Sequence, residues 1–446
     1  MTDEPTPPNS QPASPNWLAS VAEPPTQAPP PPAPARDGLS LWTVMALIAG
    51  LVVPILACGA SLYLFREIAG AESAPILIGA IWALGALGLP LAWHAAQRLR
   101  GNASGVWRTP WWWLGAASVS IVFLLIGGQL VLSLNLAPAF VIALLQPLLF
   151  AAAAAGLLAL TAGGWARMSQ LRAWANFASG AWLATFGGFA LEVIAIGLVG
   201  FIAFIIVAAV DPAQAEQIMF VIESMGEGII DMETITPLVL QPWVFSVALF
   251  AFAVIAPLIE ELFKPVGVML WLRRRPAPMA AFVGGVMGGL GFAVAETLGY
   301  LSNLNEAWVF NVILRLATLV MHAFTAGLVG WGWGQLAARR PMRLAAAYFG
   351  AVALHGLWNG IAVVIGFGSL YLQENPNGDS ATIALIGMII LASTFVLLAL
   401  VPACVAGLAF VGYRLRIAEQ RSTTASSRPT QTLAEPTSAA SATAGE

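Results

Sequence analysis

Long apolar runs, each of about 20 residues or more, follow one another along most of the chain. A helix of that length crosses a hydrocarbon core of about 30 Å. The pattern predicts about ten spans, near residues 41–65, 75–95, 111–134, 139–161, 178–210, 243–272, 279–300, 308–336, 344–366 and 381–413. We therefore predict an all-α fold, a polytopic membrane helix bundle of about ten transmembrane helices with disordered tails.

Composition agrees with a lipid environment. The chain is 59% hydrophobic and 9% charged, with a mean hydropathy of +0.82, whereas about 25% of the residues of a soluble domain are charged. This predicts an integral membrane protein, with the lipid bilayer as its surroundings. Basic stretches interleaved with aromatic residues are missing from the sequence, which argues against a nucleic-acid partner.

The pattern divides the chain into five parts. Residues 1–38 are rich in proline and predict a disordered cytoplasmic tail. Residues 39–210 form an N-terminal block of about five spans, and residues 242–416 form a C-terminal block of about five more. Between the blocks lies a loop, residues 211–241. Residues 417–446 are rich in serine, threonine and alanine and predict a second disordered cytoplasmic tail.

Arginine residues cluster in alternate connections between the predicted spans. The clusters are Arg98, Arg100 and Arg108; Arg167 and Arg172; Arg273 to Arg275; Arg339, Arg340 and Arg343; Arg414 and Arg416. Because positively charged loops remain in the cytoplasm, all five clusters and both termini are expected there. The loop of residues 211–241 is then extracytoplasmic.

This loop predicts an amphipathic helix. Asp211 and Pro212 form a cap followed by a proline at the first helical position. Apolar residues then recur at helical spacing, at Ile218, Ile222, Met225, Ile229 and Met232. We expect a helix on the outer face of the membrane, serving either as a structural element or as a lid that guides substrate.

The sixth predicted span contains three adjacent charged residues, Glu260, Glu261 and Lys264. Each charge at bilayer depth costs roughly 2.5–3.5 kcal/mol, so charges are kept there when they pair, line a cavity or react. The ammonium can satisfy one carboxylate and leave the other free for proton transfer. A purely structural ion pair is the alternative. Pro257 and Pro265 bracket the cluster and should loosen the helix.

The next three spans add further polar residues, namely Glu296, His322, His355 and Asn359. A rise of about 1.5 Å per residue places these groups and Glu260 in one layer near the middle of the bilayer. Four helices delivering acid, base and amide groups to one depth indicate a buried site. The glycine pairs at 284–285 and 288–289 are expected to let their helix approach a neighbour closely.

Three other polar residues in the spans receive weaker expectations. Glu192 can contribute to the site, although a structural polar contact is the simpler interpretation. Arg315 is expected to extend to the outer headgroups. His94 lies near Arg98 and is interpreted as an interfacial residue.

The ordered set of motifs resembles a known family. Glu260-Glu261-Leu-Phe-Lys264, Phe292-Ala-Val-Ala-Glu296, His322, and His355 with Asn359 resemble the PrsW family of bacterial intramembrane proteases. That family is distantly related to the CAAX-processing and bacteriocin-processing membrane proteases. The resemblance covers roughly residues 240–365.

The resemblance implies a function and a location. Glu260 and Glu261 would be catalytic carboxylates, Glu296 would be the acid of the second motif, and His322 and His355 would be the later histidines. Lys264 and Phe292 would support the site. The implied substrate is a single-pass membrane protein, such as an anti-sigma factor, in the bacterial cytoplasmic membrane.

Two hydrolytic schemes remain open. In a glutamate scheme, Glu260 or Glu261 activates water with help from Glu296 or His322, while His355 and Asn359 stabilise the oxyanion. In a metal scheme, three of these residues hold a divalent ion such as zinc, the ligands being Glu296, His322 and His355. The sequence lacks an HExxH motif, so spacing alone favours the metal-independent scheme.

A proton-coupled secondary transporter is the alternative class. About ten spans with carboxylates, histidines and a lysine near the membrane centre would also suit proton exchange. However, these residues are confined to the C-terminal half, and the first five spans show no matching pair of broken helices. The sequence therefore favours the protease.

Overall fold

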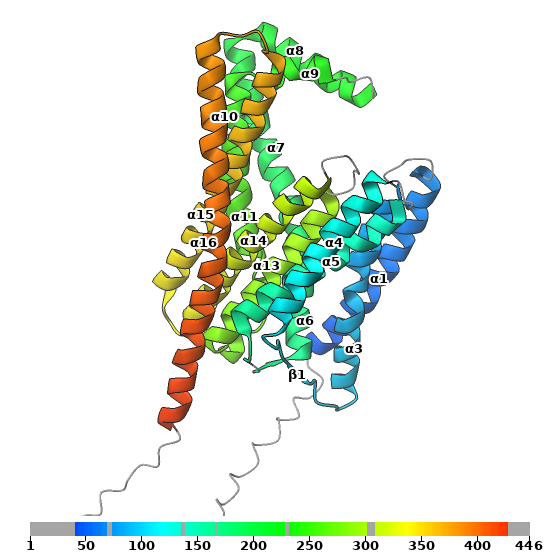
Figure 1. Ribbon diagram of the computed structural model, residues 1–446, viewed down its shortest axis with the longest axis vertical. Helices are drawn as coiled ribbons and strands as arrows, with labels where there is room; N and C mark the ends of the chain where they lie inside the picture. Colours follow the sequence, from blue (N-terminus) through cyan, green and yellow to red (C-terminus); the bar gives the residue numbers. More distant parts are fainter. Residues whose placement is uncertain are drawn as a thin grey trace, which may run out of the picture. The chain divides into compact units, whose positions relative to one another are not determined.

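The computed structural model describes residues 41–68, 74–134, 139–165, 167–227, 232–300 and 308–426. Most of these residues form long helices (Figure 1). Ten helical stretches within them are long and apolar enough to cross a membrane. The prediction of an all-α, polytopic membrane protein is therefore confirmed, and the spans start and end within several residues of the predicted positions in most cases.

The N-terminal block contains the first seven α-helices. They are α1 (Leu41–Ile68), α2 (Ala74–Ala86), α3 (Gly88–Leu99), α4 (Trp113–Ser133), α5 (Ala139–Ala162), α6 (Gln170–Ala178) and α7 (Thr185–Val210), with a π-helical turn η2 (Ser179–Ala184) joining the last two. The fifth predicted span is thus continuous from Gln170, and its turn widens where α6 meets α7.

One short strand pairing interrupts the helical pattern. β1 (Val106–Trp107) pairs antiparallel with β2 (Met168–Ser169). The two strands lie in the α3–α4 and α5–α6 connections, and Ser104 Oγ accepts a hydrogen bond from the Leu171 amide at 2.9 Å. The pairing ties together two connections that both carry arginines.

The loop between the blocks folds into two helices, α8 (Pro212–Glu227) and α9 (Met232–Val239). As predicted, Asp211 caps α8, because its Oδ1 accepts the Gln214 amide at 3.1 Å. Ile218 is buried whereas Ile222 is 52% exposed. The apolar side of α8 is therefore only partly covered by protein.

The C-terminal block contains the remaining elements. They are α10 (Pro242–Phe250), the π-helical turn η3 (Ala251–Ile255), α11 (Ala256–Phe263), α12 (Val266–Met269), the 3₁₀ turn η4 (Leu272–Arg274), α13 (Pro278–Tyr300), α14 (Trp308–Ala337), α15 (Pro341–Glu374) and α16 (Ser380–Ser426).

The sixth span is broken at the positions that its prolines predict. η3 precedes Pro257, and α11 ends just before Pro265, because proline lacks the amide hydrogen that a regular helix requires. The widened turn leaves backbone groups available to a neighbour. Asn359 of α15 donates its Nδ2 hydrogen to the Phe252 carbonyl oxygen at 3.0 Å, which ties α15 to the broken helix.

α13 is the most enclosed of the candidate spans within the described residues, with 94% of its apolar window buried. A Cβ atom on Gly288 would collide with the Lys264 carbonyl oxygen, and one on Gly289 would collide with the His322 carbonyl oxygen. The predicted packing role of these glycines is thereby confirmed. Close backbone contact brings α13 against α11 and α14, which carry the charged residues.

The predicted start of the C-terminal tail is wrong. We expected a disordered tail over residues 417–446, but the helix continues to Ser426. The reason is that its last turns are held by side-chain contacts to the α5–α6 connection. Residues 427–446 and the predicted tail of residues 1–38 lie outside the described residues.

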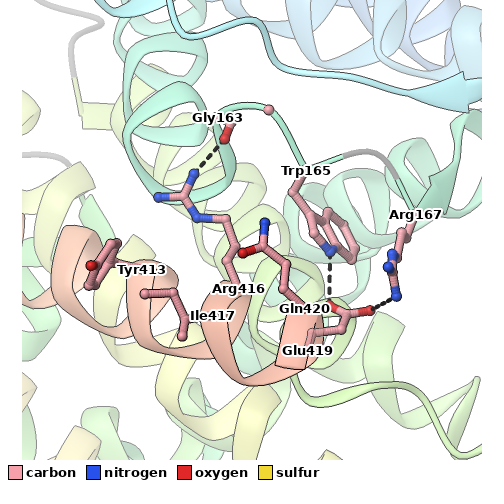
Figure 2. A pocket seen from close by; sticks show the side chains of 9 residues that line it. Gly163, Trp165, Arg167, Tyr413, Arg416, Ile417, Glu419 and Gln420 are labelled. Atoms are coloured by element: carbon pink, nitrogen blue, oxygen red, sulfur yellow. Dashed lines mark hydrogen bonds and ion pairs between the residues drawn. The ribbon is translucent and has the colours of Figure 1, made fainter. Parts of the chain in front are cut away.

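Figure 2 shows the contacts that hold the end of α16. Glu419 accepts hydrogen bonds from Trp165 Nε1 at 3.0 Å and from Arg167 at 2.9 Å. Arg416 donates to the Gly163 carbonyl oxygen. These groups border a cavity of about 600 Å³.

Candidate active site

The end of α11 carries the charged residues that the sequence singled out, with Glu260 and Glu261 in its last turn and Lys264 directly after it. Residues three and four positions apart share a helix face, and Lys264 Nζ lies 2.9 Å from Glu260 Oε2 and 2.6 Å from Glu261 Oε1. Glu261 and Lys264 are fully buried, and Glu260 is 7% exposed. We expected the ammonium to satisfy one carboxylate, but it pairs with both because its position between them allows two contacts.

Lys264 also reaches side chains from three other helices. Its Nζ lies 2.7 Å from His322 Nδ1 on α14 and 3.4 Å from His355 Nδ1 on α15. The Phe292 ring of α13 lies 4.6 Å from the same atom, a cation–π contact. Five of the other predicted residues therefore meet around one ammonium group, namely Glu260, Glu261, Phe292, His322 and His355.

The contacts of His322 determine where its ring proton lies. An ammonium can only donate hydrogen bonds, so Nδ1 accepts from Lys264 and the hydrogen of the neutral ring is on Nε2. Nε2 lies 3.0 Å from Glu296 Oε2 and donates to it. Glu296 Oε1 lies 3.5 Å from Arg315. Arg315 thus points to Glu296 rather than extending to the headgroups as we expected, because that carboxylate offers a nearer partner.

His355 lies behind the two carboxylates. Its Nδ1 is 2.9 Å from Glu261 Oε1, and its Nε2 is 3.7 Å from Glu260 Oε2. Thr325 also donates to Glu261 Oε1, at 3.1 Å. Sequence reasoning missed Thr325, although its position one turn after His322 on α14 places both on the same face. Glu261 therefore has three neighbours that hold it in place.

A cavity of about 960 Å³ opens beside this group. Its polar lining includes Glu192, Glu260, Glu296, His322 and Asn359. The rest is mainly apolar, with residues from α2, α7 and α15 such as Leu77, Phe189 and Val363. The lining formed by the described residues does not include Glu261, Lys264 or His355, which lie behind it. The site thus has a layer facing the cavity and a layer behind.

Glu192 belongs to the layer that faces the cavity. It comes from α7, outside the C-terminal block, and is half-buried. Of the two interpretations of Glu192 left open by the sequence, its place in the cavity wall favours a contribution to the site.

One group of residues has the spacing of a metal site. Glu260, His322 and His355 each offer one ligand atom, and these atoms lie within 4.8 Å of one another. A carboxylate with two imidazoles is a common catalytic zinc set, and the cation that lies beside Glu260 Oε2 in this structure is the Lys264 ammonium, at 2.9 Å. The residues therefore fit a divalent ion in type and spacing. The predicted set contained Glu296 instead of Glu260; Glu296 lies beyond His322, hydrogen-bonded to its Nε2.

Comparisons with known proteins bear on this geometry. Neither a search of curated proteins nor a search of solved structures found a match. The family described as PrsW family intramembrane metalloprotease matches residues 109–401, well over half of the chain. The match extends beyond the region of resemblance noted from the motifs and includes every helix that contributes to the charged group. The chain therefore belongs to the PrsW family of intramembrane metalloproteases.

Proposed function

We propose that this protein hydrolyses a peptide bond of a membrane-anchored protein within the bilayer, and that the bond is cut in the cavity beside Glu260. The observation that carries the proposal is a set of five ionisable side chains buried in a membrane-spanning bundle next to an open cavity. Buried charges are costly in lipid and are therefore a sign of function.

Glu260 is the proposed general base. It lines the cavity, where water can reach its carboxylate and give up a proton to it. Glu261 is sealed behind it, held by Lys264, His355 and Thr325. We assign Glu261 a positioning role, since a group that does not face the cavity has no access to substrate.

Three other residues on the cavity wall complete the scheme. The proton that Glu260 takes from water can reach the leaving amine by way of the Glu296–His322 pair, in which His322 Nε2 and Glu296 share a hydrogen bond at the cavity wall. Asn359 uses one amide hydrogen on the Phe252 carbonyl oxygen and has a second for the oxyanion. His355 lies behind the cavity lining, so we assign it to holding Glu261.

A metal-dependent scheme would use the same residues differently: Glu260, His322 and His355 would hold a divalent ion of the kind that the family name implies, and Glu260 would then be a ligand instead of the base. When bound there, the ion would supply Lewis-acid polarisation of the peptide carbonyl.

The lining of the cavity favours a membrane-anchored protein as the substrate. Most of the lining is apolar, which suits the side chains of a transmembrane segment, while the polar groups gather at one place where a peptide bond could be attacked. The arginine pattern supports an orientation with both termini in the cytoplasm of a bacterium. A single-pass protein such as an anti-sigma factor is the substrate class that the family resemblance suggests.

The test is a cleavage assay with purified protein in lipid vesicles and a panel of single-span reporter proteins. We expect wild type to release fragments whose masses place the cut inside the membrane segment. Glu260→Gln should abolish cleavage, and Glu216→Gln, an exposed change on α8, should not. Cleavage by the Glu260→Gln variant at the wild-type rate would rule out this base.

A further inference from the structure

We infer that the Lys264 ammonium occupies the place of the metal ion, and that a divalent ion can be held by Glu260, His322 and His355 only after this ammonium moves away. The inference deepens the proposed function and rests on it for the identity of the site. It concerns how the chain's own cation and an added cation share one set of ligands.

Lys264 Nζ lies close to all three residues of the candidate metal group. Every member of the candidate metal group has an atom close to Nζ: Glu260 Oε2 at 2.9 Å, His322 Nδ1 at 2.7 Å and, on the ring of His355, Nδ1 at 3.4 Å. A zinc ion would need its ligands at about 2.0–2.2 Å, in the same space. Two cations cannot share that space, because they would overlap and repel each other.

The lone pairs of the ligand atoms show what the ammonium blocks. His322 accepts from Lys264 at Nδ1 and donates to Glu296 from Nε2, so neither nitrogen has a free lone pair. Glu260 Oε2 is likewise occupied, because it lies 2.9 Å from the same ammonium. His355 donates from Nδ1 to Glu261 Oε1, so its lone pair is on Nε2. His322 can therefore bind a metal through Nδ1 only when Lys264 releases that atom.

The cation at this position is a lysine and not an arginine. Lys264 is the only lysine in the sequence, and all other basic side chains except the histidines are arginines. An ammonium is a compact point charge with three donors, whereas a guanidinium is planar and larger. Only the ammonium can sit among two carboxylates and two imidazoles as a small metal ion would.

The surroundings offer the displaced ammonium two partners that the metal group does not use. Glu261 Oε1 lies 2.6 Å from Nζ, and the Phe292 ring lies 4.6 Å from it. Neither residue belongs to the metal group, so both remain available as the side chain turns aside. The lysine stem also begins where α11 ends, directly before Pro265, which lacks the amide hydrogen that would continue the helix.

The first test measures metal affinity without substrate. Purified full-length protein is stripped with a chelator and titrated with Zn²⁺ by calorimetry. If the ammonium blocks the site in about nine molecules of ten, Lys264→Met should bind one Zn²⁺ about tenfold more tightly than wild type. The double variant Lys264→Met with Glu260→Gln should lose that gain. Equal affinity in wild type and Lys264→Met, or loss of binding in Lys264→Met, would overturn the inference.

The second test uses wild type alone, so it does not depend on a variant that folds. Because the chain has one lysine, reductive methylation followed by mass spectrometry reports on Lys264 apart from the N-terminal amine. We expect Lys264 to be protected in metal-free protein and to be methylated several-fold faster once Zn²⁺ is bound. Zinc binding that leaves Lys264 fully protected would contradict displacement.

These outcomes are independent of the proposed function. A protein that cleaves reporters but binds Zn²⁺ without releasing Lys264 would retain the proposed function and lose this inference. A protein that exchanges Lys264 for Zn²⁺ but cuts no reporter would do the reverse.

Discussion

Two clusters in this protein pair carboxylates with cations, and they differ in how deeply they are buried. The buried cluster consists of Glu260, Glu261, Lys264, His322 and His355. The surface cluster consists of Trp165, Arg167, Arg416 and Glu419 at the end of α16 (Figure 2).

The side chains of the two clusters make similar contacts in different surroundings. Lys264 and Glu261 are 2.6 Å apart and have no exposed side-chain surface, whereas Arg167 and Glu419 are 2.9 Å apart and their side chains are 48% and 14% exposed. An exposed pair is worth about 0–1 kcal/mol. A buried pair must offset a desolvation penalty of several kcal/mol per ion. The exposed pair is therefore interpreted as a structural contact. The buried pair is interpreted as part of a functional site, because its desolvation penalty makes it an expensive way to stabilise a fold.

The largest expected effect tests the chemistry of the buried cluster. His322→Ala removes the partner of Lys264 and Glu296 on the cavity wall, so we expect reporter cleavage to fall about 10²–10⁴-fold, the range of a lost acid–base group. Initial rates in vesicles would measure the loss. Arg167→Ala in the surface cluster is the control and should cleave normally; an equal loss in both variants would remove the distinction between the clusters.

The next effect concerns folding stability. Glu261→Ala leaves Lys264 with one fewer counter-charge in the interior, so we expect the free energy of unfolding to fall by about 3–5 kcal/mol. Unfolding in mixed micelles, followed by circular dichroism, would measure it. A change in the free energy of unfolding below about 1 kcal/mol, the typical value of an exposed pair, would show that the buried Glu261–Lys264 pair contributes no more to stability than a pair on the surface.

A smaller effect tests the packing that positions the cluster. Gly288→Ala places a methyl group against the Lys264 carbonyl oxygen, and we expect a loss of about 1–3 kcal/mol from overpacking, with slower cleavage. Gly115→Ala on α4 is the matched control, because a Cβ there meets nothing within 4 Å. If both variants are equally stable and active, the close approach of α13 is not needed for the site.

The smallest effect belongs to the surface cluster. Glu419→Ala removes the partner of Trp165 and Arg167, and we expect a loss of about 0–1 kcal/mol with unchanged cleavage. Limited proteolysis should show that the last turns of α16 become more accessible. Strong loss of activity without loss of folding would give this cluster a role that its exposure does not suggest.

Much of the fold could be predicted because lipid offers the backbone no hydrogen-bond partners. In lipid, every backbone polar group must be paired within its own helix, so the lengths of apolar runs directly predict the spans. The proline positions likewise predicted the break in the sixth span, since a missing amide hydrogen has the same effect in any context. The extension of α16 to Ser426 was not predictable, because it depends on Glu419 meeting a connection more than 250 residues earlier in the chain.

The candidate site divides in the same way. The sequence by itself determined which residues are costly in lipid and therefore candidates for function, because that cost depends on residue type and span alone. Only the tertiary structure decided that Glu260 rather than Glu296 joins the two histidines, that Thr325 and Arg315 are partners, and that Lys264 lies among the ligands. Those facts depend on how four helices approach and rotate against one another, and the packing around α13 sets that arrangement.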